Sequence, residues 1–209
     1  MDYEYSDRVF ENILKETEKW EKEFYKTPMF KQFSKTRKED TKMILPLVPD
    51  FMYGYYLRRP KEWTAAALEE MLLDLFPRKL VADEGFYESV EPVLTEYFTF
   101  LQATGRIKNA KALIARLHKV APLMLVASNE PENWGPGKQI AHFAEELGFD
   151  FSDEASIKAY MDMVNNGIMS SEEAPKKEKT GQFNHLCSCG SGKNFSDCHG
   201  GNVIEFPNT

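Results

Sequence analysis

Apolar residues recur at intervals of three and four along the first two-thirds of the chain, a pattern typical of amphipathic helices. Between residues 6 and 33 the charged side chains Lys15, Glu16, Glu21 and Lys22 fall largely opposite the apolar stripe. The stripe consists of Val9, Phe10, Ile13, Leu14, Trp20 and Phe24. The pattern predicts a helix over this range, with a break expected at Thr27-Pro28 because proline cannot continue the hydrogen-bond ladder.

A second helix is predicted to begin at Thr64. The Thr64 hydroxyl can accept a hydrogen bond from a free amide of the first turn, and Trp63 is placed to pack on Leu68 as a hydrophobic staple. Pro77 lacks an amide hydrogen and its ring crowds the preceding turn, so the helix is expected to stop there. Its buried stripe is predicted to comprise Leu68, Met71, Leu72, Leu75 and Phe76.

Two longer helices are predicted next. The first runs from about residue 89 to residue 101, and Gly105 suits the left-handed position just past its end. Asn109 is expected to cap the second, which carries Pro122 in its interior. Proline removes an amide and crowds the carbonyl four residues back, so Pro122 is expected to kink or divide this helix.

The remaining periodic segments predict shorter helices over residues 136 to 147, ended by Gly148, and over residues 152 to 165. No sustained alternation of apolar and polar residues indicates a half-buried strand. The stretch from 43 to 48 is interrupted by Pro46. The fold class predicted from the sequence is therefore all-α.

The chain divides by composition into four parts. Residues 1–169 form the predicted helical body. Residues 170–183, which are almost entirely small, polar or charged, read as a solvated, flexible linker. Residues 184–201 hold all three cysteines and form a small predicted knuckle, followed by a tail at residues 202–209.

Net charge and hydropathy narrow the functional classes. The chain has 33 acidic and 26 basic residues among 209, giving a formal net charge of −7. Bulk attraction to nucleic acid is therefore not expected, and any phosphate contact would be local. The start of the chain lacks the pattern of a secretory signal, and no run of roughly 18 apolar residues could span a membrane. We expect a cytoplasmic protein.

The knuckle carries a set of metal ligands. Cys187, Cys189, Cys198 and His199 place three thiolates and an imidazole at the two ends of a short loop. A segment this small cannot fold on buried area alone and needs a staple. Zinc accepts such a set in a tetrahedral shell, and four protein ligands leave no open position. The ion is therefore expected to be structural. The alternative is a coincidental cluster of thiols.

These residues resemble the SEC-C motif, CxCx(8)C followed by His or Cys, found at the C-terminus of the SecA translocase and in YecA-like bacterial proteins. The Gly-Ser-Gly-Lys stretch between the second and third cysteines agrees as well, whereas Ser188 stands where members usually have proline. The resemblance covers only the knuckle. It implies a zinc-binding interaction module, with iron as the alternative occupant, and puts the ligands at the four residues named above.

The most exposed part of such a knuckle would be its rigid turn. Lys193 and Phe195 lie in the loop between the ligand pairs, and we expect them to contact a partner. The alternative is that both side chains serve the knuckle internally. Because the metal fixes the backbone, less entropy is lost on binding than for a free peptide. The predicted function is an adaptor or interaction protein whose partner is a protein or the ribosome.

Two features of the body bear on this prediction. Basic residues gather in three runs, which could form an RNA or ribosome surface if the fold placed two side by side. The runs are Lys31, Lys35, Arg37 and Lys38; Arg58, Arg59 and Lys61; and Arg106, Lys108 and Lys111. The alternative function is an enzyme with a cleft in the body that uses His118, His142 or acidic side chains, in which case the metal would be structural only.

Overall fold

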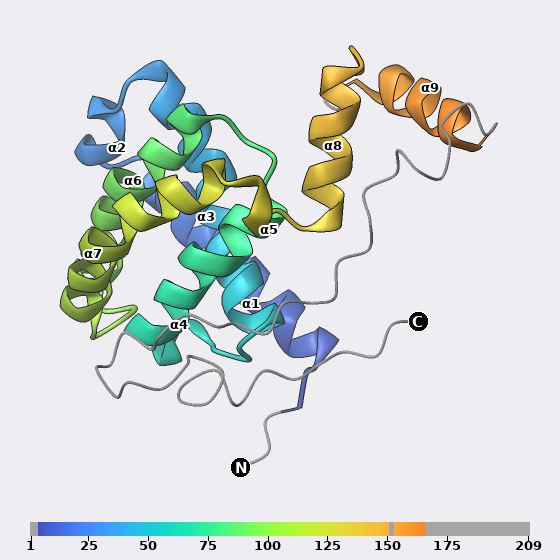
Figure 1. Cartoon of the computed structure of the whole chain (residues 1–209). Coiled ribbons are helices and arrows are strands. Elements are labelled where there is room, and N and C mark those ends of the chain that lie inside the picture. Colours follow the sequence, from blue (N-terminus) through green and yellow to red (C-terminus); the bar gives the residue numbers. More distant parts are fainter. Residues whose placement is uncertain (1–3, 151–152, 166–209) are drawn as a thin grey trace, which may run out of the picture.

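The computed structural model describes residues 4–150 and 153–165, and these residues form helices and connecting loops without a strand. The predicted all-α class of the body is therefore confirmed (Figure 1). The elements are α1 (Asp7–Phe24), α2 (Pro28–Gln32), α3 (Lys35–Gly54), η1 (Pro60–Glu62), α4 (Ala65–Glu70), η2 (Met71–Leu75), α5 (Phe76–Lys79), α6 (Glu84–Ala103), α7 (Ala110–Asn129), η3 (Pro131–Asn133), α8 (Pro136–Glu146) and α9 (Glu154–Asn165). The predicted linker, knuckle and tail lie outside the described residues.

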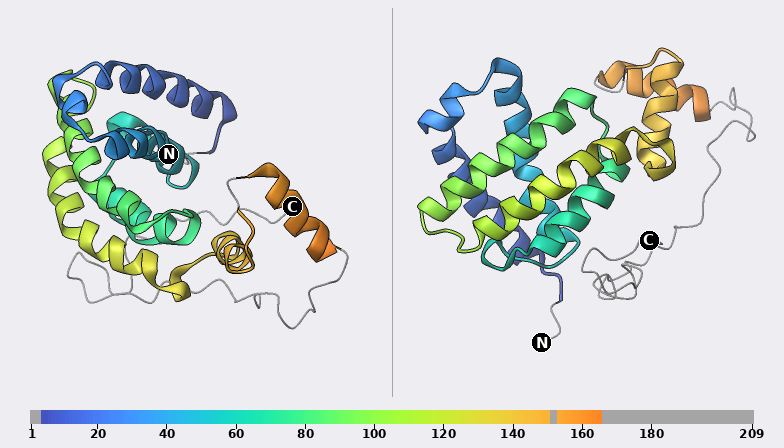
Figure 2. Two further views of the ribbon diagram at one scale, coloured as in Figure 1. Left: turned by 90° about the horizontal axis from the view of Figure 1, so that it is seen from above. Right: turned by 60° about the vertical axis from the view of Figure 1, so that its left-hand side comes forward.

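Helix α6 makes the main contacts between the long helices. It packs on α7 and on α3, while α1 covers α3 and the α4–η2–α5 segment packs on α7 (Figure 2). The largest fully buried side chains include Trp63, Tyr97, Phe24, Phe76 and Phe98. Helices α8 and α9 lie at one side of this bundle, beyond α5 (Figure 1). No described helix is both long and apolar enough to cross a bilayer.

The predicted break at Thr27-Pro28 and the predicted helix start at Thr64 are both confirmed. The chain breaks after α1, and the Thr27 hydroxyl caps α2 by accepting a hydrogen bond from the Phe30 amide at 3.2 Å. The Thr64 hydroxyl accepts one from the Ala67 amide at 3.1 Å. Trp63 is 1% exposed and belongs to the same core as Leu68. The two helix-ending glycines, at 105 and 148, have φ of 73° and 87° as expected.

The prediction that Pro77 ends its helix is wrong. The chain stays helical through Lys79 because a π-helical turn, η2, precedes the proline. In that turn the Phe76 amide donates to the Met71 carbonyl, five residues back instead of four. The wider turn places Pro77 in the first turn of α5, where an amide hydrogen is not required and the ring is tolerated.

Proline was also a poor guide to helix α3, which the sequence pattern did not predict. Pro46 and Pro49 lie within it. An interior proline costs about 3 kcal/mol or more. Full burial of a large apolar side chain stabilises by about 1.5–3 kcal/mol. Because α3 buries several such side chains, tertiary packing outweighs the lost hydrogen bonds. Those with no exposed surface are Ile44, Leu45, Val48 and Met52.

The two long helices also differ from their predicted limits. Helix α6 begins at Glu84, not near Ser89, because the Asp83 carboxylate caps it by accepting from the Phe86 amide at 2.8 Å. Pro122 does not divide α7. Asn109 stands at the cap position, but its side-chain amide donates to the Trp63 carbonyl at 2.5 Å and makes no cap hydrogen bond.

Helix α8 is anchored through its first residues. The Gly135 amide donates to the Arg78 carbonyl at 3.0 Å. Lys138 is 5% exposed, and its ammonium donates to the Pro77 carbonyl at 3.1 Å and the Ser128 carbonyl at 3.1 Å. It also donates to the Tyr87 hydroxyl at 3.2 Å. Lys138 therefore joins α8 to the ends of α5 and α7, where helix dipoles favour a cation.

Gly135→Ala is expected to loosen this junction, whereas Gly137→Ala is expected to leave it intact. A Cβ at Gly135 would lie 2.8 Å from the Arg78 Cγ and 2.9 Å from the Arg78 carbonyl oxygen. A Cβ at Gly137 would meet nothing within 4 Å. Hydrogen exchange of the α8 amides checks this. Faster exchange only in Gly135→Ala is the expected result, and equal exchange in both variants would contradict the close approach.

Candidate functional site

The predicted metal centre lies outside the described residues. This holds for Cys187, Cys189, Cys198 and His199, and also for the two proposed contact residues Lys193 and Phe195. Within residues 4–150 and 153–165, no group of three or more His, Cys, Asp or Glu side chains is arranged to hold a metal ion. The ligand set at residues 187–199 therefore remains a prediction from the sequence.

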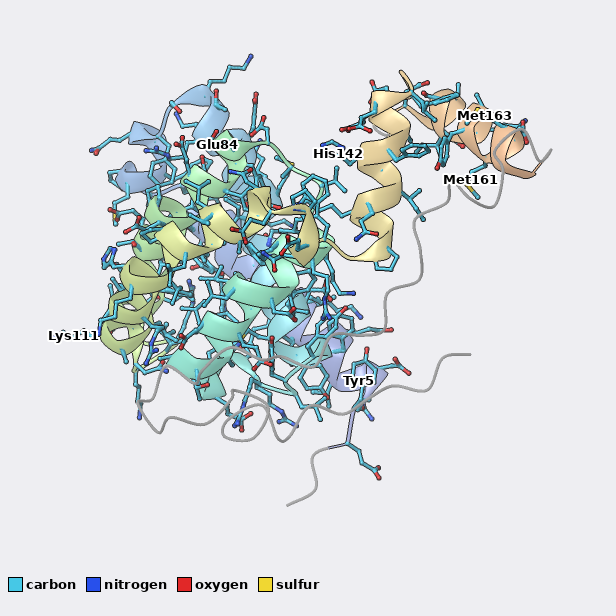
Figure 3. The ribbon with its side chains drawn as sticks, in the orientation of Figure 1. Tyr5, Glu84, Lys111, His142, Met161 and Met163 are labelled. Carbon is cyan, nitrogen blue, oxygen red and sulfur yellow. The ribbon has the colours of Figure 1, made fainter. Side chains whose placement is uncertain are left out.

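The two histidines considered for catalysis occupy separate surroundings. His118 on α7 pairs with Glu91 on α6, with 2.5 Å between Nδ1 and Oε1. His142 on α8 lies against the Trp134 ring, with 4.6 Å between centroids, and 3.6 Å from the Glu146 carboxylate (Figure 3). Their contacts share no residue. Neither lines any of the three grooves described below.

The fold brings two of the three basic runs together. The segment containing Arg58, Arg59 and Lys61 leads into Trp63, whose carbonyl accepts the Asn109 hydrogen bond. Arg106 lies over the Trp20 ring, 5.4 Å from its centroid. Trp20 in turn lines a groove with the 59–62 segment. The second and third runs therefore lie at one end of the bundle, as the ribosome-surface hypothesis requires.

The five cations of this end form what we call the basic surface: Arg58, Arg59, Lys61, Lys108 and Lys111. All five are exposed, and no ion pair within the described residues neutralises them. Arg106 differs, because it pairs with Glu23. Figure 3 shows Lys111 at the start of α7, at the end of the bundle away from α8 and α9.

A groove of about 410 Å³ borders the basic surface. It runs between α1 and η1 and combines apolar side chains with both signs of charge. Its lining is Val9, Asn12, Ile13, Glu16, Trp20, Arg59, Pro60, Lys61 and Glu62. Glu16 and Glu62 line the groove together with Arg59 and Lys61, so the charge within it is mixed, whereas Arg58, Lys108 and Lys111 lie outside its lining.

The first basic run is separate and partly used within the fold. The Lys38 ammonium donates to the Lys31 carbonyl at 2.8 Å, and the Arg37 guanidinium lies 5.9 Å from the Phe33 ring centroid. These contacts hold the turn between α2 and α3. The side chains of Arg37 and Lys38 therefore make contacts within the fold, in contrast to the basic surface.

A second groove, of about 270 Å³, lies between α1 and α3 and contains a buried carboxyl group. Glu21 is 6% exposed, although the helical pattern placed it opposite the apolar stripe. That expectation is corrected by α3, which covers the flank of α1 that carries Glu21. The sequence held one signal, because Glu21 follows Leu14 and Thr17 at helical spacing and both lie on the covered flank.

Burial governs the chemistry of Glu21. The pKa of its carboxyl group is raised to about 7, mainly by loss of solvation and also by the neighbouring Glu18, while Tyr25 and Lys22 oppose the shift. The Tyr25 hydroxyl lies 3.5 Å from the Glu21 carboxylate, at the limit of a hydrogen bond. Glu21 is therefore a buried acid with weak compensation inside the protein.

A third groove, of about 360 Å³, lies between α3 and the segment that leads into α6. It is mostly apolar, and Met43 and Val81 are 54% and 49% exposed there. Its two carboxylates are occupied: Asp40 accepts from the Ser89 hydroxyl at 2.6 Å, and Asp83 caps α6. Its one lysine, Lys79, has its ammonium 5.0 Å from the Tyr55 ring centroid. The groove therefore offers mainly apolar contact area.

Comparisons with protein-family models, curated protein sequences and solved structures found no significant match to this chain.

Proposed function

We propose that this protein is a cytoplasmic, metal-dependent adaptor in which the C-terminal knuckle recognises a protein or ribosomal partner. The observation that carries the proposal is the ligand set Cys187, Cys189, Cys198 and His199, with the spacing of the SEC-C motif. Zinc is the preferred ion, with iron as the alternative, because three thiolates and an imidazole suit it. A closed shell gives the ion a structural role, so recognition falls to the side chains around it.

The basic surface supports a second contact from the body. It presents five exposed cations in a chain whose net charge is −7. Such a surface attracts a phosphate backbone locally even though the whole molecule is acidic. A ribosomal partner would therefore bind through both the knuckle and the basic surface, and its binding would weaken as salt rises. A protein partner held by the knuckle alone would depend less on salt.

Lys193→Ala and Phe195→Ala are each expected to reduce partner capture by the intact protein. Both variants retain the four ligands, so the metal-bound fold of the knuckle should persist while its exposed turn loses a charge or an aromatic ring. Pull-downs from lysate at two salt concentrations, with metal content measured in each sample, provide the check. Glu205→Ala, outside the predicted knuckle, is the matched control.

The outcomes separate the parts of the proposal. Loss of the same partners in both variants, but not in Glu205→Ala, supports recognition by the knuckle. Salt-sensitive capture that also falls when Lys108 and Lys111 are changed to alanine supports the ribosomal partner. If both knuckle variants hold metal and capture the same partners as the parent protein, the knuckle does not recognise them and the proposal is wrong.

A further inference from the structure

The groove between α1 and α3 is small and is lined by one buried acid, Glu21, and by the exposed Glu18, which pairs with Lys22. Its apolar walls come from Leu14 on α1 and from Pro46 and Pro49 on α3. At about 270 Å³ it falls below the size usual for cofactors and drug-sized ligands, and it suits a single side chain or small group. Figure 2 shows α1 lying along α3, so the groove follows the contact between the two helices.

The charged groups around Glu21 leave it without a cation of its own. On α1, Lys22 is held by Glu18 at 2.5 Å, and Lys15 at the groove rim is held by Glu11 at 3.2 Å. Tyr25, which caps the end of α1, and Tyr97 on α6 also lie near Glu21, and burial raises the pKa of both phenols, so both are neutral. Helix α3 contributes only Pro46 and Pro49 to the groove lining.

We propose that this groove binds the basic side chain of a partner protein, lysine or arginine, with Glu21 as its counter-ion. A buried carboxylate with only one long hydrogen bond is unstable unless a cation reaches it or it takes up a proton. The side chain of lysine or arginine has an apolar part and a charged part, and each matches a part of the groove. Its methylene stem packs on apolar walls, while its cationic end meets the acid. This contact is independent of the C-terminal knuckle.

The pairing makes binding depend on pH. A cation prefers the ionised carboxylate, whose pKa lies at about 7 in the free protein. Below that pH the proton must first leave, so affinity falls as pH falls; above it the carboxylate is already ionised and affinity levels off. Between pH 6 and pH 8 the affinity is therefore expected to rise about tenfold, since a lysine ammonium stays charged throughout this range.

The test compares two blocked amino acids of similar shape. N-acetyl-lysine N-methylamide carries the cation, and N-acetyl-norleucine N-methylamide has the same stem without it. Backbone amide shifts of α1 and α3 in the full chain, followed by NMR at pH 6 and pH 8, report binding. At pH 8 we expect the lysine compound to bind at least tenfold more tightly than the norleucine compound. This difference in affinity should be lost in Glu21→Gln. Glu16→Gln, an exposed acid on the same helix, is the control.

A second measurement covers the case in which Glu21→Gln alters the fold. In the unchanged protein, the carboxyl carbon of Glu21 is titrated with and without the lysine compound, and bound cation should lower its apparent pKa. Equal affinity for both compounds, no binding, or an unchanged Glu21 titration would each overturn the proposal. If free spermidine binds in place of the lysine compound, the proposal that the partner is a protein would be wrong.

Discussion

Replacing Cys198 with serine is expected to remove the bound metal while leaving the helical body folded. Three thiolates and one imidazole complete the predicted shell, and a serine hydroxyl is a poor ligand for zinc. The knuckle is too small to fold without the ion, so binding and local folding should be lost together. The metal content measured by elemental analysis should therefore fall from one ion per chain to nearly none after dialysis against a mild chelator.

The helical body should not respond to the same change. Its core is built from residues 20–124, so its helicity and melting temperature should stay close to those of the parent protein. Ser188→Ala, which lies between two predicted ligands in the sequence but is not one itself, is the matched control and should keep its metal. Undiminished metal content in Cys198→Ser would contradict the assignment of that ligand. Elemental analysis also distinguishes zinc from iron.

Lys138→Met is expected to destabilise the protein by about 1–3 kcal/mol, with the loss concentrated at α8. Methionine fills a similar volume but cannot donate to the Pro77 and Ser128 carbonyls that Lys138 reaches at 3.1 Å. The substitution also removes the ammonium group that lies 4.9 Å from the Trp134 ring centroid. Burial lowers the pKa of Lys138 to about 8, so most molecules still carry the ammonium at pH 7.

Chemical denaturation and hydrogen exchange together check this expectation. The unfolding midpoint should fall, and the α8 amides should exchange faster than those of α6 and α7. Lys119→Met is the matched control, because Lys119 is an exposed lysine on α7 and its loss should change stability little. Similar effects in the two variants would show that the buried hydrogen bonds of Lys138 do not anchor α8.

Local chemistry was sufficient wherever a feature depends on neighbours along the chain. The caps at Thr27 and Thr64 follow from a hydroxyl placed just before a free amide. Gly105 and Gly148 follow from the left-handed backbone that ends a helix. The spacing of Cys187, Cys189, Cys198 and His199 predicts a ligand set from the sequence alone, and this prediction lies outside the described residues.

The prolines show where local rules fail. Pro77 was expected to end a helix and Pro122 to kink or divide one, yet Pro77 lies inside helical structure and Pro122 does not divide α7. Pro46, which counted against a strand, also lies inside a helix. The free-energy cost of proline in a helix is set by its own ring and missing amide hydrogen. What offsets this cost lies in other residues, such as the π turn before Pro77 and the side chains that α3 buries. Such compensation depends on packing partners far away in sequence, which periodicity cannot identify.

What the sequence by itself determined is the helical class of the body, several helix ends and a candidate metal set. Only the tertiary structure decided which charges are buried and which are left exposed together. Glu21 became a buried acid because α3 covers its flank of α1, and Lys138 became an anchor because two helix ends meet beside it. The basic surface formed because residues 58–61 and 108–111 meet across the Trp63–Asn109 hydrogen bond. Solvation, and hence charge chemistry, is set by three-dimensional neighbours that the sequence order does not reveal.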